Sequence, residues 1–266
     1  MSSTLSRDQV LEEMGISPRW VRRDPATAVR SANLGTAARL PTPEVSVTSA
    51  QAEPLPLPLP EKRVAPVLDS RVDIAGMNWE DLRQRIKSCQ SCNLCTERKQ
   101  AVPGVGDESA SWLFIGEGPG AEEDARGEPF VGQAGKLLDA MLAAIDLKRG
   151  EDVYIANAVK CRPPGNRTPE ADELAACFPY LQRQIDLIRP KLIVLLGRVA
   201  VASVLGQDAS LSSLRGKTLS YRAGDREVPV IVTYHPAYLL RNLPDKAKAW
   251  EDLCRARALM RSLKTE

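Results

Sequence analysis

Short apolar runs alternate with segments of helical periodicity over the C-terminal two-thirds of the chain. Residues 192–196 read Leu-Ile-Val-Leu-Leu, which suits a strand buried on both faces of a sheet. Similar runs at Trp112–Gly116, 153–159 and 228–234 are also predicted to be strands. Strands separated by helices pair in parallel through right-handed crossovers. The pattern predicts an α/β fold, a three-layer α/β/α sandwich with a central four-stranded, mainly parallel sheet.

Four helices are predicted between and after these strands, at residues 79–87, 132–145, 168–188 and 246–263. The third should begin at Thr168, because a capping hydroxyl is followed there by Pro169 and an acid. In parallel sheets, ligand sites lie beyond the carboxyl ends of the strands. Four segments fall at those ends and are expected to form one cleft: residues 116–120, 157–162, 197–198 and 235–236.

The first 76 residues differ in composition from the rest and contain few apolar clusters. Residues 1–40 are interpreted as a tail, with a possible partner-binding peptide at 11–24, and 41–76 as a Pro/Ala-rich disordered linker. The folded domain is then 77–266. The start of the chain lacks a secretory signal, and the apolar runs are too short to span a bilayer, so no membrane association and a cytoplasmic location are expected. A net charge of +2 neither favours nor excludes nucleic acid as a partner.

The six cysteines are not expected to form disulfides in a reducing cytoplasm. Cys89, Cys92, Cys161 and Cys177 form a candidate four-thiolate site, which would suit zinc and an iron–sulfur cluster equally well. Cys95 offers an alternative partner for Cys92. The simplest interpretation of Cys95 and Cys254 is that they are small hydrophobic residues.

The only histidine, His235, directly follows a predicted strand and could stabilise a developing anion. The glycine-rich turn at 116–120 lacks the Gly-Lys-Ser/Thr ending of a P-loop, and the acids that follow it favour water handling or polar base recognition. Basic residues near these segments could form a local strip that contacts phosphates: Lys160, Arg162, Arg167 and Arg241.

Five ordered motifs resemble those of family 4 uracil-DNA glycosylases, the iron–sulfur members of their superfamily. They read GEGPGAEED, GEPFVGQAGKLLD, YIANAVKCRPPGNRTP, LIVLLG and HPAYLLRN. The resemblance covers residues 89–266 and implies a uracil-DNA glycosylase of base-excision repair. It also implies a [4Fe–4S] cluster held by Cys89, Cys92, Cys161 and Cys177, with Cys95 not a ligand.

The same resemblance implies the residues of the active site. Phe130 would stack on the extruded uracil, Asn157 would read its edge beside the Gly116 and Gly118 turn, and His235 would bond its O2 atom. Where the best-known branch of the superfamily has an aspartate, this chain has Gly118, so Glu117 and Glu123 are the nearest candidates to handle water. The DNA-contacting candidates are Arg162 and the wedge residues Leu239, Leu240 and Arg241.

Three alternatives remain. A relative that stays covalently attached to its product is disfavoured, because the chain lacks a second histidine after the glycine-rich motif. A non-catalytic DNA-binding or polymerase-associated module is a second possibility, and a zinc-stabilised structural protein is a third. Residues 11–24 resemble a peptide of the psi subunit of bacterial DNA polymerase III, which implies a replication or repair protein as partner. The expected enzyme is a monomer that acts on single- or double-stranded DNA containing uracil.

Overall fold

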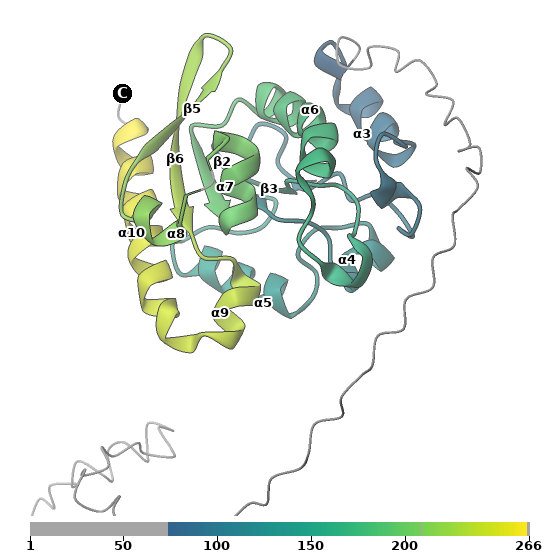
Figure 1. Cartoon of the computed structure of the whole chain (residues 1–266). Coiled ribbons are helices and arrows are strands. Elements are labelled where there is room, and N and C mark those ends of the chain that lie inside the picture. The colour runs from purple at the N-terminus through teal and green to yellow at the C-terminus, as the bar shows by residue number, and fades with distance from the viewer. Residues whose placement is uncertain (1–73, 208, 265–266) are drawn as a thin grey trace, which may run out of the picture. The chain divides into compact units, whose positions relative to one another are not determined.

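The computed structural model of the chain describes residues 74–207 and 209–264 (Figure 1). The predicted tail at 1–40, with its peptide at 11–24, and the linker up to residue 73 lie outside the described residues. Ile74 is 3% exposed and packs with Leu82 and Ile86. The folded unit therefore includes Ile74, which the sequence analysis had assigned to the end of the linker.

A six-stranded sheet with the order β1-β3-β2-β4-β6-β5 forms the centre of the folded unit. Its four inner strands run parallel, as predicted. They are β2 (Trp112–Gly116), β3 (Val153–Asn157), β4 (Leu192–Leu196) and β6 (Arg226–Thr233).

Two antiparallel edge strands, which the sequence analysis did not predict, extend the sheet to six. They are β1 (Val105–Gly106) and β5 (Leu219–Ala223). β1 has only two residues, and β5 exposes alternate side chains, so neither has the continuous apolar run of a central strand.

Helices cover both faces of the sheet, which confirms the three-layer fold (Figure 1). Along β2, Leu113 and Ile115 point into one core, whereas Trp112 and Phe114 point into the other. The first core is closed by α6 (Ala171–Ile188), α7 (Arg198–Leu205) and α8 (Leu211–Leu214). The second is closed by α5 (Gln133–Ala143), α9 (Pro236–Arg241) and α10 (Lys246–Leu263).

A third apolar cluster holds the cysteine-rich segment against α6. The helix α3 (Trp79–Lys87) is capped by Asn78, whose side-chain oxygen accepts the Asp81 N–H at 3.0 Å. The short helix η2 (Asn93–Cys95) follows, and Leu94 and Leu82 are both buried in this cluster. This packing places the first cysteines beside Tyr180 of α6.

The helix α6 begins at Ala171, with Glu170 rather than Thr168 as its N-cap. The predicted start is therefore wrong, because the Glu173 carboxylate accepts the Glu170 N–H at 2.8 Å and closes the first turn there. Among the residues that the structure describes, no helix is both long enough and apolar enough to cross a membrane.

Candidate active site

A cavity of about 560 Å³ lies at the carboxyl ends of the parallel strands. All four segments that the sequence placed at this edge contribute to its wall, through Glu117, Asn157, Gly197 and His235 among others. The pairing of Gly116 with Asn157 in the β2–β3 ladder brings the first two segments together. The remaining lining residues include Gly118, Glu123, Phe130, Asn166, Arg167, Arg198, Tyr234, Tyr238 and Arg241.

Gly116 lies behind the cavity and does not line it. A Cβ atom there would stand 2.5 Å from Cζ of Phe130 and 2.6 Å from Oδ1 of Asn157. Such contacts are too short for any real side chain, so only glycine lets the aromatic ring and the amide approach the end of β2 together. The role of Gly116 is therefore to make room for the two residues that face the ligand.

Asn157 supplies an oxygen that is ready to accept a hydrogen bond. The residue is 1% exposed, and its Oδ1 atom has no partner in the described structure. Buried polar atoms are nearly always paired, so an unpaired one in a cavity wall points to a ligand donor. The Asn157 main-chain oxygen is fixed separately by Lys160 Nζ at 2.8 Å, which holds the strand end in place.

Phe130 is held in the left-handed conformation, with φ of 55°. Its ring lies 5.4 Å from the His235 ring, at an interplanar angle of 29°. Arg149, which the sequence analysis missed, donates to the Phe130 and Pro129 carbonyl oxygens at 2.8 Å and 2.9 Å. Because such a conformation is costly for a non-glycine residue, these bonds keep the ring in position.

His235 caps α9, and its Nδ1 atom accepts the Ala237 N–H at 3.1 Å. Burial and, to a smaller extent, the positive charge of Arg241 lower the pKa of His235 to about 4, against a smaller opposing effect of Glu123. The imidazole is therefore neutral at pH 7. Since Nδ1 accepts a hydrogen bond, the single ring proton is on Nε2, which can donate one.

The two carboxylates of the glycine-rich segment have different surroundings. Both oxygens of Glu123 are engaged: Oε1 accepts from Val131 and Gly132 at 2.9 and 3.0 Å, and Oε2 accepts from Gly120 at 3.1 Å. Glu117 also lines the cavity, and burial raises its pKa, while Arg198 opposes that rise. Glu123 therefore joins α4 (Ala121–Arg126) to the Phe130 loop, whereas Glu117 is the carboxylate placed to interact with a ligand or water.

Comparisons with known proteins agree with this geometry. Residues 103–254 match the model of the uracil DNA glycosylase superfamily. The chain belongs to that superfamily. It is 46% identical over 177 residues to the type-4 uracil-DNA glycosylase of Sulfurisphaera tokodaii, covering 65% of this chain and 80% of the relative. The identity to the type-4 enzyme of Archaeoglobus fulgidus is 47% (60% and 82% covered), and to that of Thermotoga maritima 42% (68% and 94% covered). Within the superfamily, the chain is a type-4 member.

In this type-4 family member, the three DNA-contacting candidates at residues 239–241 differ in exposure. Leu239 is 1% exposed and packs in the core between α5 and the sheet, so its predicted role as a wedge is wrong. Leu240 is 41% exposed, and Arg241 is exposed at the cavity rim. Leu243, in the short helix η4 (Leu243–Asp245), is 60% exposed and was missed by the sequence analysis.

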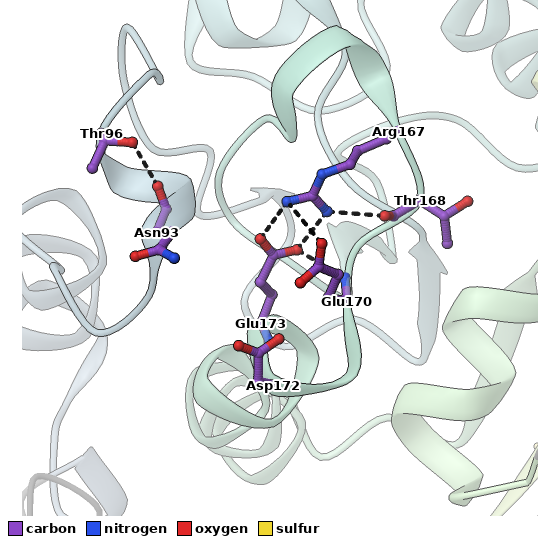
Figure 2. A network of polar contacts seen from close by, with 7 residues as sticks. All are labelled: Asn93, Thr96, Arg167, Thr168, Glu170, Asp172 and Glu173. Carbon is purple, nitrogen blue, oxygen red and sulfur yellow. Dashed lines mark hydrogen bonds and ion pairs between the residues drawn. The ribbon is translucent and has the colours of Figure 1, made fainter. Parts of the chain in front are cut away.

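The basic residues of this family member do not form one exposed strip. Lys160 is 1% exposed, which corrects its suggested phosphate contact. Arg167 lines the cavity but forms a two-bond pair with Glu173, at 2.6 and 2.9 Å, and donates to the Thr168 carbonyl at 3.1 Å (Figure 2). Arg162 is half-buried and donates to Asn166 at 2.7 Å, beside the cavity. The predicted phosphate contacts of Arg162 and Arg241 stay predictions, because neither side chain is buried in the core.

The four predicted thiolate ligands line one small recess, together with Tyr180 and Lys160. Cys95 is not among the lining residues, and Cys254 is exposed on α10. Burial raises the pKa of the Cys161 thiol to about 11, which a hydrogen bond from Arg98 partly offsets. Among the described residues, no three histidine, cysteine or acidic side chains converge as they would around one metal ion. In a four-iron cluster each cysteine sulfur binds a different iron, so the four protein ligands need not converge on one point.

Proposed function

We propose that this type-4 family member hydrolyses the N-glycosidic bond of uracil in DNA, releasing uracil and leaving an abasic site. The observation that carries the proposal is the unpaired, buried Oδ1 of Asn157, a residue that lines the same cavity as Phe130 and a neutral His235. These three residues supply an amide that can hydrogen-bond the edge of the base, an aromatic ring that can stack on its face and a hydrogen-bond donor. Type-4 uracil-DNA glycosylases are among the relatives that the chain resembles.

The Asn157 amide gives a physical reason for the choice of uracil. Uracil presents a donor at N3 and an acceptor at O4, which match the amide oxygen and the amide N–H groups. Cytosine presents the opposite pair and would leave the buried amide facing like groups. Because an unpaired buried polar group costs about 1–3 kcal/mol, this mismatch disfavours cytosine.

The chemistry proposed for the site is cleavage of the C1′–N1 bond followed by attack of water at C1′. The electron pair of the broken bond passes to uracil, and negative charge collects on O2, where Nε2–H of His235 donates a hydrogen bond. Glu117 orients the water and takes its proton as the new C1′–O bond forms. Glu123 is proposed to position Phe130. Gly118 lines the cavity beside the base, and Gly116 makes room for Phe130 and Asn157.

The base must leave the duplex to reach this cavity. Leu240 is proposed to fill the vacated space, with Arg241 and Arg162 on the flanking phosphates. The support for this assignment is the exposure of Leu240 and the place of Arg241 at the rim. Action on either single- or double-stranded DNA, a monomeric state and a protein partner for residues 11–24 stay predictions.

Cys89, Cys92, Cys161 and Cys177 are proposed to hold a [4Fe–4S] cluster. The type-4 group is the iron–sulfur-containing one, and four sulfur donors around one recess suit such a cluster. When bound, it would brace the loop from Asn157 to Cys161 against α3 and α6, without taking part in bond cleavage. Iron content and absorbance near 400 nm of the anaerobically purified protein test this assignment.

Single-turnover cleavage of a uracil-containing oligonucleotide tests the proposed reaction. We expect His235→Ala and Asn157→Ala each to slow cleavage at least about tenfold, since about 1.4 kcal/mol of barrier corresponds to that factor. Ser203→Ala is a matched control, because Ser203 Oγ is also buried and unpaired but lies outside the cavity. If folded wild-type protein leaves uracil in place, the activity is refuted and a non-catalytic DNA-binding or polymerase-associated module becomes the better assignment.

A further inference from the structure

Arg98 makes an unusual contact at the edge of the four-cysteine recess. Its Nη1 atom donates to Sγ of Cys161 at 2.7 Å, and its Nη2 atom donates to the carbonyl oxygens of Cys89 and Lys87 at 2.8 and 2.9 Å. One guanidinium therefore joins two segments that carry ligands, α3 with the first cysteines and the loop after β3. The proposed reaction at the uracil cavity does not use Arg98, which lies outside its wall.

A second cation, Lys160, lines the same recess. Lys160 is 1% exposed, and its main-chain N–H donates to Sγ of Cys177 at 3.2 Å. Its ammonium group donates to the Asn157 carbonyl oxygen and to Oε1 of Gln184, at 2.8 and 2.6 Å. Both acceptors are neutral, so hydrogen bonds alone do not balance the buried positive charge.

Negative charge in the recess would balance both cations. Four cysteine thiolates carry more negative charge than the core of an iron–sulfur cluster carries positive charge, so the loaded centre is a net anion. Buried charges are tolerated when they are paired. The contacts of Arg98 with Cys161 and of Lys160 with Cys177 place two cations beside such an anionic centre.

We propose that Arg98 and Lys160 are the charge partners of the four-cysteine centre and that together they set its reduction potential and its retention of iron. The inference rests on the cluster proposed above. Hydrogen bonds to ligand sulfurs and nearby charge are among the protein's means of setting such potentials. Both cations stabilise the more negative, reduced form, so both raise the potential. Lys160 also connects the centre to the strand end that carries Asn157.

The test uses full-length, anaerobically purified protein and three variants. Arg98→Met removes the charge and the N–H···S bond from a half-buried position, and Lys160→Met removes the buried charge. Lys99→Met is the matched control, because Lys99 is the exposed neighbour of Arg98. Two quantities are measured: the midpoint potential of the cluster, and the rate of iron release to a chelator, followed by the loss of absorbance near 400 nm.

We expect a more negative potential in Arg98→Met and in Lys160→Met, but not in Lys99→Met. Iron release from Arg98→Met should be about tenfold faster, as expected when a hydrogen bond to a charged group is lost. If Lys160→Met does not fold, Arg98→Met and Arg98→Lys decide the question, because lysine keeps the charge and should restore part of the potential.

Two results would overturn the inference. Unchanged potential and iron release in Arg98→Met would exclude an electrostatic role, and faster release at an unchanged potential would reduce Arg98 to a structural brace. A wild-type protein without iron or 400 nm absorbance would instead refute the cluster itself, whatever the variants do. Uracil release by the wild type is scored separately, so failure of the glycosylase assignment is distinguishable from both.

Discussion

Replacing each pocket glutamate with glutamine tests the division of roles between Glu117 and Glu123. In Glu123→Gln, the single amide oxygen can still accept from Val131 and Gly132, but the amide N–H₂ then faces the Gly120 N–H, a donor against a donor. Hydrogen bonds to charged groups contribute about 1.5–3 kcal/mol, so we expect a loss of about 2 kcal/mol in the free energy of unfolding. For a folded unit of this size, that lowers Tm by about 4–8 °C.

Glu117→Gln should show the opposite pattern. Burial raises the pKa of Glu117, which means that the folded state disfavours the charged form of this carboxyl group. Removing the charge should therefore leave Tm at pH 7 unchanged or higher. Cleavage should slow by about 10²-fold, a typical contribution of a positioned acid–base group.

Thermal unfolding and single-turnover cleavage of the same preparations distinguish the two roles, with Glu122→Gln as the matched control because Glu122 is exposed on the same helix. The control should change neither quantity. A Glu117→Gln protein that melts several degrees lower, beside a Glu123→Gln protein with wild-type Tm, would refute the reasoning.

Three further predictions follow from the site. The pKa of His235 falls from the ordinary 6.5 to about 4 on folding, so between these pH values the unfolded chain binds a proton that the folded chain does not; the free energy of unfolding should therefore decrease by roughly 3 kcal/mol as pH falls through this range. Urea unfolding at pH 7 and pH 4.5 should show a smaller decrease in His235→Asn than in the wild type. An equal decrease in both proteins would contradict the assignment. Arg149→Met should slow cleavage at least about tenfold, because it releases the loop that holds Phe130 in its strained conformation. Asp139→Asn removes only the ion pair of Arg149 and should slow cleavage less. Equal rates in the wild type and Arg149→Met would show that Arg149 does not position Phe130. Leu240→Ala should keep wild-type stability but cleave duplex DNA more slowly than single-stranded DNA. Leu239→Ala should lose about 2–5 kcal/mol in the free energy of unfolding. If denaturant unfolding instead showed the larger loss in Leu240→Ala, the two leucines would have to exchange roles.

The positions of the main site residues could be predicted from the sequence because they depend on local pattern. Continuous apolar runs define the parallel strands, and such sheets place ligands at the strand ends. This rule places His235 and the segment that begins at Asn157 at the ligand edge, since each stands at or just after the end of a strand, whereas the role of Asn157 was implied by the family resemblance. The cysteine spacing likewise indicated a four-thiolate site, although it did not distinguish zinc from a cluster.

The fold determined what neighbouring, similar residues do. Leu239 and Leu240 are identical in type, and one turns into the core while the next turns to solvent, because successive residues of a helix point about 100° apart. Glu123 accepts from the Val131 and Gly132 N–H groups, eight and nine residues away in the chain, whereas Glu117 lines the cavity and interacts electrostatically with Arg198.

The sequence by itself determined the four parallel strands, the edge at which the site lies and the kinds of residue that build it, because apolar runs and their flanking residues are local patterns in the chain. Only the tertiary structure decided that Lys160 is buried beside the cysteines rather than exposed to phosphate, that Arg98 and Arg149 hold parts of two different sites, and that β1 and β5 close the edges of the sheet. The two arginines depend on partners far away in the sequence: Arg98 is 63 residues from Cys161, and Arg149 is 19 residues from Phe130. Burial and charge pairing are set by such distant contacts, and no local pattern records them.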